Sequence, residues 1–213
     1  MTKTLTEVTG LVLAGGRSAR MGGADKGLQP FHGEALAHHA ARRLDEQVAQ
    51  VMVSANQNLE VYRGWKWPVF MDTPPGHLGP LAGFATGLGH CTTPWLMTCP
   101  CDSPLFPLDL VDVMLHEAQR TQCRLAVAVG QEHDAAHRFT GELRIQPVFC
   151  LIHRDLEAGL RQHIAKGVRK ITDWLAAENA CHVLFDRPQD RLAFLNVNSP
   201  AELLSLERLI PRS

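Results

Sequence analysis

Short apolar runs rich in β-branched residues alternate along this chain with segments whose apolar residues recur at helical spacing. This alternation favours a largely parallel sheet covered by helices on both faces. The sequence therefore predicts the α/β class, as a single-domain three-layer sandwich with a mostly parallel, twisted sheet. Strands are expected over residues 9–13, 50–54, 68–71, 95–99, 125–129, 147–152 and 193–196, and helices over residues 34–47, 80–91 and 108–120.

Two further segments carry local signals. Ser199 and Glu202 have the spacing of a capping box, so a final helix is predicted to begin at Pro200. Residues 129–141 are polar and predict a mobile loop. His133 and His137 in that loop have the spacing of a helical zinc site but lack its glutamate, which favours a solvated or substrate-covering loop.

Length and charge limit the possible functions. With 213 residues the chain can bury one large core, and one domain over residues 1–213 is expected. A formal net charge of −1 gives no reason to expect binding to nucleic acid or to an acidic membrane. The apolar run before Gly15 is too short for a signal-peptide core, and no apolar stretch has membrane-spanning length, so a cytoplasmic location is expected.

The six cysteines are scattered, mostly in apolar segments where a free thiol behaves as a small hydrophobic group. We therefore expect no disulfide framework. Cys99 and Cys101 lack both the spacing and the second ligand pair of a zinc site.

Residues 11–28, LVLAGGRSARMGGADKGL, run from an apolar strand into a glycine-rich turn. Glycine lets the backbone approach a ligand and point N–H groups at phosphate oxygens. Positive charge comes from Arg17, Arg20 and Lys26. The segment predicts a polyphosphate site, although it matches neither the GxxxxGK[ST] loop nor the GxGxxG fingerprint.

Polar side chains follow several predicted strands, and in open α/β sheets ligands lie beyond the carboxyl ends of the strands. Asp102 follows a buried strand, and Mg²⁺ prefers such a carboxylate together with substrate phosphates. An Asp at this point can instead cap the next turn. Asn198 has the same two interpretations, as a second oxygen ligand of the metal or as a residue that orders the turn before the final helix.

The segment 11–28 resembles the signature LAGGxSxRMGxxK of the nucleotidyltransferases related to the molybdenum cofactor guanylyltransferases, with one more residue before Lys26 than this signature has. Further segments follow in the order seen in that family, namely VSAN, Asp72 after a strand, GPLAG, CPCDSP, QPVF and NVNSP. The resemblance implies a Rossmann-like nucleotidyltransferase fold. It also implies a nucleotide-binding half at about residues 1–105 and a pterin-substrate half at about residues 106–213.

The same resemblance implies two sets of contact residues. The nucleotide would contact Leu13, Ala14, Gly15, Gly16, Lys26, Asn56, Asp72, Gly79 and Asp102, with Asp102 also binding Mg²⁺. The pterin substrate would contact Gln146, Pro147, Asn196 and Asn198. Arg169, a cation beside a predicted helix end, is a further candidate for that substrate, with a solvated surface role as the alternative.

The implied reaction is attack by the terminal phosphate of molybdenum-bound molybdopterin on the α-phosphorus of GTP, with Mg²⁺ as cofactor. Arg20, Lys26 and Asp102 would act by positioning and charge stabilisation. Gly16 and the GPLAG segment resemble those of the guanine-using members, and Asp72 can accept the N1 and N2 hydrogens of guanine. Transient contacts with proteins that deliver or receive the cofactor are expected.

Three alternatives remain open from the sequence. A cytidylyltransferase acting on molybdopterin or a sugar-phosphate nucleotidyltransferase would share the glycine-rich segment. A nucleotide-binding regulator without activity would need that segment but not Asp102 together with Asn198.

Overall fold

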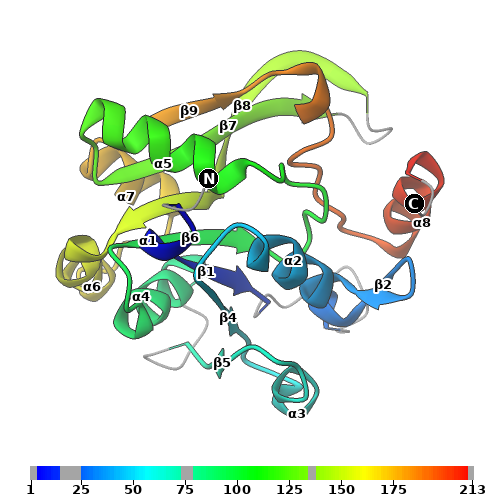
Figure 1. The fold of residues 1–213 in the computed structure, drawn as a ribbon, viewed down its shortest axis with the longest axis horizontal. Helices are drawn as coiled ribbons and strands as arrows, with labels where there is room; N and C mark the ends of the chain where they lie inside the picture. The colour runs from blue at the N-terminus through cyan, green and yellow to red at the C-terminus, as the bar shows by residue number, and fades with distance from the viewer. Residues whose placement is uncertain (1–3, 15–24, 73–78, 134–137, 211–213) are drawn as a thin grey trace.

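The computed structural model describes residues 4–14, 25–72, 79–133 and 138–210, which form a single α/β domain around one large sheet (Figure 1). Within these residues the sheet has seven strands in the order β5-β4-β1-β6-β8-β7-β9, and β2 and β3 form a separate pair. The strands are β1 Val8–Leu13, β2 Pro30–Phe31, β3 Glu34–Ala35, β4 Gln50–Ser54, β5 Val69–Phe70, β6 Trp95–Pro100, β7 Leu125–His133, β8 Phe139–His153 and β9 Cys181–Phe185. The α-helices are α1 Thr4–Glu7, α2 Leu36–Asp45, α3 Leu59–Arg63, α4 Pro80–His90, α5 Leu110–Thr121, α6 Glu157–Ala165, α7 Ile171–Ala177 and α8 Pro200–Leu209, and the 3₁₀ turns are η2 Lys26–Leu28, η3 Arg154–Leu156 and η4 Pro188–Asp190.

The parallel part of the sheet is centred on β1. This strand pairs in parallel with β4 and β6, and β4 pairs in parallel with β5. Val12 of β1 packs into the core on one face of the sheet and Leu11 into the core on the other, and both are fully buried. Strands buried on both faces appear as continuous apolar runs, which explains why the predictions at 9–13, 50–54 and 95–99 are confirmed.

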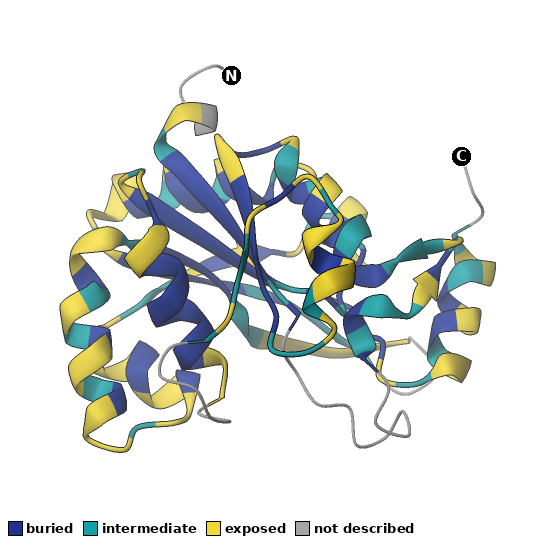
Figure 2. Cartoon of the chain, turned by 90° about the horizontal axis from the view of Figure 1, so that it is seen from below, coloured by how far each residue is buried: buried dark blue, intermediate teal, exposed yellow. Residues whose placement is uncertain are grey.

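Two apolar cores cover the two faces of the sheet. Helices α2 and α5 contribute Leu44 and Met114 to one core, while α4, α6 and α7 contribute Phe84, Leu160 and Trp174 to the other. Figure 2 shows the buried strands between helices whose outer surfaces are exposed. The predicted three-layer α/β sandwich is confirmed.

Strand β8 runs antiparallel to both β6 and β7. Strands β7 and β8 continue together as a long hairpin, in which Gly130 pairs with Arg144 and His133 with Phe139 (Figure 1). The prediction of a mobile loop at 129–141 is therefore wrong for its described residues, and residues 134–137 lie outside them. The first six residues of β8 are exposed, so their polar composition reflects contact with water rather than the absence of regular structure.

The last strand lies earlier in the chain than predicted. Residues 191–194 form a turn in which Ala193 and Phe194 are buried, so the strand predicted at 193–196 is wrong. The strand that completes the sheet is β9, an edge strand that pairs in parallel with β7 and alternates exposed and less exposed side chains. The helices predicted at 80–91 and 108–120 correspond to α4 and α5, whereas the first part of 34–47 is strand β3. None of the helices within the described residues has the length and apolar character needed to cross a bilayer.

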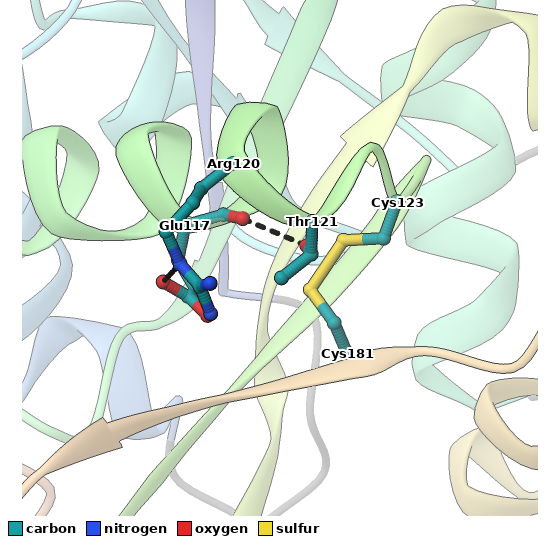
Figure 3. Close-up of a disulfide and its surroundings, with 5 residues drawn as sticks. All are labelled: Glu117, Arg120, Thr121, Cys123 and Cys181. Carbon is teal, nitrogen blue, oxygen red and sulfur yellow. Dashed lines mark hydrogen bonds and ion pairs between the residues drawn. A yellow bond between two sulfur atoms is a disulfide. The ribbon is translucent and has the colours of Figure 1, made fainter.

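A disulfide joins Cys123, just after α5, to Cys181, the first residue of β9 (Figure 3). Their Cα atoms are 6.3 Å apart, within the range that disulfides span. They meet because β9 lies parallel to β7 and pairs Cys181 with Ala126. The expectation of no disulfide framework missed this single pair, because strand β9, which places Cys181 near Cys123, was not predicted from the sequence. The other four cysteines are free and buried.

Candidate functional site

Lys26, Asp102 and Asn198 meet beyond the carboxyl ends of β1 and β6, and we call these three residues the Lys26 cluster. Lys26 Nζ donates to Asp102 Oδ2 at 2.5 Å and to Asn198 Oδ1 at 2.8 Å. The side chains of Lys26 and Asp102 are only 14% and 20% exposed, so their attraction is screened less than that of a surface pair. The structure thus brings together three residues that the sequence analysis assigned to charge stabilisation and metal binding.

Backbone hydrogen bonds hold Asp102 at the end of its strand. The Cys101 N–H donates to the Leu13 carbonyl at 3.1 Å, which ties the turn after β6 to the end of β1. The Val197 N–H donates to the Asp102 carbonyl at 2.8 Å and brings the segment before α8 to the same place.

The start of α8 fixes Asn198. The Glu202 N–H donates to Ser199 Oγ at 3.2 Å, so the predicted N-cap of this helix is confirmed. The Glu202 carboxylate accepts from the Asn198 N–H at 2.7 Å, one residue earlier than in a standard capping box. The cap of α8 therefore also orients a residue of the Lys26 cluster.

A second polar group, the Asp72 cluster, consists of Ser54, Asn56 and Asp72. Ser54 Oγ donates to Asp72 Oδ1 at 2.6 Å, and Asn56 Nδ2 donates to Asp72 Oδ2 at 2.8 Å. The Asp72 N–H donates in return to Asn56 Oδ1 at 3.0 Å. The ends of β4 and β5 thus hold one carboxylate in a fixed orientation, and sequence reasoning had assigned no role to Ser54.

Other predicted nucleotide contacts lie beside these clusters or outside the described residues. The Ala14 N–H donates to the Ser54 carbonyl at 2.8 Å, so the end of β1 reaches the Asp72 cluster. Gly79 begins α4 with φ of +77°, a conformation that favours glycine. Gly15, Gly16 and Arg20 lie outside the described residues, and their roles remain predictions.

A cavity of about 840 Å³ opens beside the Lys26 cluster, which contributes Asn198 to its wall. We call it the hairpin cavity, and it is lined by Gln131, Glu132, His133, Leu143, Arg144, Ile145, Gln146, Pro147, Thr172, Phe194, Leu195, Asn196, Asn198 and Glu202. Four of the five residues predicted to contact the pterin are in this set. Most of the remaining wall comes from the β7–β8 hairpin, of which Gln131, Glu132 and His133 fall in the stretch 129–141 that was predicted to be a loop.

Arg169, the fifth predicted pterin contact, does not line this cavity. Its Nη1 donates to the carbonyls of Ile164 and Val168 at 2.7 and 2.9 Å, at the end of α6. The cation that the structure places on the cavity wall is Arg144, which pairs with Glu132 at 2.5 Å. Arg144 lies between the loop predicted at 129–141 and the strand predicted at 147–152, so no prediction covered it.

The Lys26 cluster offers oxygen ligands but no reactive thiol. Burial, and secondarily the Asp102 carboxylate, raises the pKa of the Cys99 and Cys101 thiols above their usual range, so both stay neutral. The carboxylate of Asp102 and the amide oxygen of Asn198 converge on a single positive group, Lys26 Nζ. A hard divalent cation prefers this donor set.

Comparisons with known proteins identify the family of this chain. Residues 10–181 match the family described as MobA-like NTP transferase domain, and the chain belongs to that family. It is therefore a nucleotidyltransferase, as expected from the resemblance of its motifs.

One relative and two solved structures illustrate the similarity. The chain is 48% identical to the molybdenum cofactor guanylyltransferase of Acidovorax sp. strain JS42, over 95% of this chain and 96% of the relative. It shares its fold with molybdopterin-guanine dinucleotide biosynthesis protein A from Archaeoglobus fulgidus, with a TM-score of 0.71, 19% identity and coverage of 94% and 97% of the two chains. The 2-C-methyl-D-erythritol 4-phosphate cytidylyltransferase of Thermus thermophilus has the same fold, with a TM-score of 0.69, 18% identity and coverage of 95% and 98%.

Proposed function

We propose that this nucleotidyltransferase transfers GMP from GTP to the terminal phosphate of molybdenum-bound molybdopterin, with release of pyrophosphate. The observation that carries the proposal is the Lys26 cluster, in which a partly buried cation meets two oxygen ligands, one of which, Asn198, also lines the hairpin cavity. The name of the Acidovorax relative supports guanylyl transfer to a molybdenum cofactor. Molybdopterin is proposed to occupy the cavity, and GTP to lie over the ends of β1, β4 and β5.

In this reaction, an oxygen of the acceptor phosphate forms a bond to the α-phosphorus of GTP. The bond from that phosphorus to the oxygen bridging the α- and β-phosphates breaks, and pyrophosphate leaves. The attacking phosphate is already anionic, so no side chain has to remove a proton from it. Lys26 opposes the negative charge that grows on the departing pyrophosphate. Arg20, outside the described residues, is proposed to do the same.

Asp102 and Asn198 are proposed to hold Mg²⁺. Among the described residues, no group of three or more His, Cys, Asp or Glu side chains could hold a metal ion. Mg²⁺ commonly uses one or two carboxylates and completes its coordination with water and substrate phosphates, and the oxygens of Asp102 and Asn198 are donors of this kind. When bound, the ion supplies positive charge that offsets the charge of the triphosphate.

The Asp72 cluster is proposed to select guanine. Each Asp72 carboxylate oxygen accepts one hydrogen bond within the cluster, and each has capacity for another. The carboxylate can therefore also accept from the N1 and N2 hydrogens of guanine. Cytosine does not offer this pair of hydrogens.

The decisive experiment incubates the purified protein with molybdopterin, Mg²⁺ and each nucleoside triphosphate in turn, and measures pyrophosphate. We expect release with GTP, and only when acceptor and Mg²⁺ are both present. Asp102→Asn is expected to lose most of this activity, whereas a substitution of the exposed residue Leu204 on α8 is expected to retain it. Release with CTP instead would favour a cytidylyltransferase, and release only with a sugar phosphate as acceptor would reject molybdopterin as the substrate.

A further inference from the structure

The residue before Lys26 is a buried carboxylate that sequence reasoning passed over. Asp25 is 6% exposed, although an Asp is seldom buried without partners. Its Oδ1 accepts from Tyr62 Oη at 2.9 Å and from the Gly27 N–H at 3.0 Å, and its Oδ2 accepts from Asn58 Nδ2 at 3.0 Å. The carboxylate thus has a donor from its own turn, a donor from the N-cap residue of α3 and a donor from α3 itself.

The donors on α3 are themselves held in place. Tyr62, the only tyrosine in the chain, is fully buried. Burial, followed by the charge of Asp25, raises its pKa well above the usual range, so the hydroxyl keeps its proton. Asn58 has φ of +49°, a left-handed conformation that Asn and Asp tolerate better than most residues. Both donors therefore have fixed positions when they meet Asp25.

These contacts surround the backbone of Lys26 on both sides. Asp25 precedes it, and Gly27 follows it so close to α3 that an added methyl group at Gly27 would collide with Tyr62 Oη. The turn that carries Lys26 is therefore held against α3 by these contacts. The side chain of Lys26 extends from this turn, and its ammonium group bonds Asp102 and Asn198.

We infer that Asp25, together with Asn58 and Tyr62, forms a positioning set that holds Lys26 for the transfer reaction. None of the three needs to touch the substrates, so they are positioning residues rather than catalytic ones. The segment that carries Asn58 also carries Ser54 and Asn56 of the Asp72 cluster. The same stretch of backbone thus carries two residues that orient Asp72, the proposed guanine-binding carboxylate, and one that supports the turn of Lys26, the proposed phosphate-binding lysine.

Exchanging the residue types at positions 25 and 58 tests this inference, because Asn58 donates a hydrogen bond that Asp25 accepts. In Asp25→Asn, the negative charge is lost and the new carboxamide nitrogen faces the Asn58 amide nitrogen, so Asn58 has to turn its amide around before the two side chains can bond. In Asn58→Asp, two carboxylates oppose each other. In the double variant Asp25→Asn/Asn58→Asp, the carboxylate at position 58 again accepts from the amide at position 25, and Asp is tolerated at the left-handed position 58.

Two readouts separate positioning from simple loss of folding. The first is kcat for GTP at saturating acceptor, measured on folded protein of matched concentration. The second is the rate at which an amine-acylating reagent modifies Lys26 without substrates, measured by mass spectrometry relative to Lys66, whose side chain is 65% exposed. The second readout needs no assumption about the reaction.

We expect each single variant to lose about tenfold or more in kcat, the scale of a hydrogen bond to a charged group, and to show faster acylation of Lys26. We expect the double variant to recover most of both changes. Tyr62→Phe keeps the buried ring and removes one donor, so a smaller change in the same direction is expected, and this variant also guards against a folding failure of the others.

The inference is overturned if Lys26 acylation in the single variants and in Tyr62→Phe equals that of the wild type. It is also overturned if the double variant is as impaired as the product of the two single effects. The kcat readout rests on the proposed function, whereas the acylation readout does not. A wild-type protein that releases no pyrophosphate from GTP would thus refute the function while the acylation rates still test the positioning set.

Discussion

Asp72 is the residue at which nucleotide selection can be separated from general phosphate binding. The Asp72→Ala variant is expected to weaken GTP binding far more than binding of inorganic triphosphate, because only GTP presents the hydrogens of the base to the carboxylate. Loss of hydrogen bonds to a charged group corresponds to about 1.5–3 kcal/mol. Isothermal titration with both ligands measures the difference, and equal losses for both would reject the assignment.

Lys26 is the residue whose charge is expected to act on the reaction itself. Removal of one preorganised charge typically raises a barrier by about 2.7–4 kcal/mol, so Lys26→Ala is expected to lose at least roughly a hundredfold in kcat. Lys66→Ala is the matched control, because Lys66 forms an exposed ion pair with Asp45 at 2.6 Å, and such pairs contribute little. Unchanged turnover in Lys26→Ala would remove Lys26 from the mechanism.

At the scale of elements, Arg187 connects the start of α5 to η4. Its guanidinium contacts both carboxylate oxygens of Asp109 at 2.6 and 2.9 Å and also bonds the buried Asp190. Arg187→Met is therefore expected to lower the free energy of unfolding at pH 7 by about 2 kcal/mol, since it leaves a buried carboxylate without its main partner. Arg191→Met, at a nearby exposed position, serves as the control in urea denaturation.

The ion pair between Arg187 and Asp109 makes the free energy of unfolding depend on pH. The hydrogen bond from Arg187 lowers the pKa of Asp109 in the folded state. The resulting stability is fully present above the unfolded-state pKa of about 3.9 and is lost as the pH falls through the folded value. The difference between wild type and Arg187→Met is thus expected to shrink below about pH 4, and a difference that stays constant from neutral to acidic pH would contradict this account.

The elements best predicted from sequence are those buried on both sides. Strands β4 and β6 have continuous apolar runs, and the glycine-rich segment and Asp102 follow directly from the ends of such strands. By contrast, β9 and the β7–β8 hairpin contact water along much of their length, so their composition resembles that of loops. Asp25 escaped notice because a carboxylate in a glycine-rich turn looks solvated until Tyr62 and Asn58 are placed beside it.

At the scale of the whole molecule, ligand binding is expected to raise the melting temperature. A ligand at about 100 times its dissociation constant stabilises the folded state by about 2.7 kcal/mol. GTP with Mg²⁺ is expected to raise the midpoint more than GTP alone, and Asp102→Asn is expected to abolish the part that depends on Mg²⁺. Differential scanning calorimetry measures both effects, with CTP as the comparison, and an unchanged Mg²⁺ increment in the variant would exclude Asp102 as a metal ligand.

The reversed direction of β8 also has an evolutionary consequence. Because β8 is antiparallel to β6, the first half of β8 lies on the side of the sheet where β1 and β6 end. This half of β8 pairs with β7 in the hairpin and lines the cavity. Hairpin strands keep the same side chains facing inward when they gain or lose residues in pairs. Insertions or deletions of residue pairs in the hairpin can therefore deepen or narrow the cavity that it lines, while the central strands β1, β4 and β6 stay unaltered.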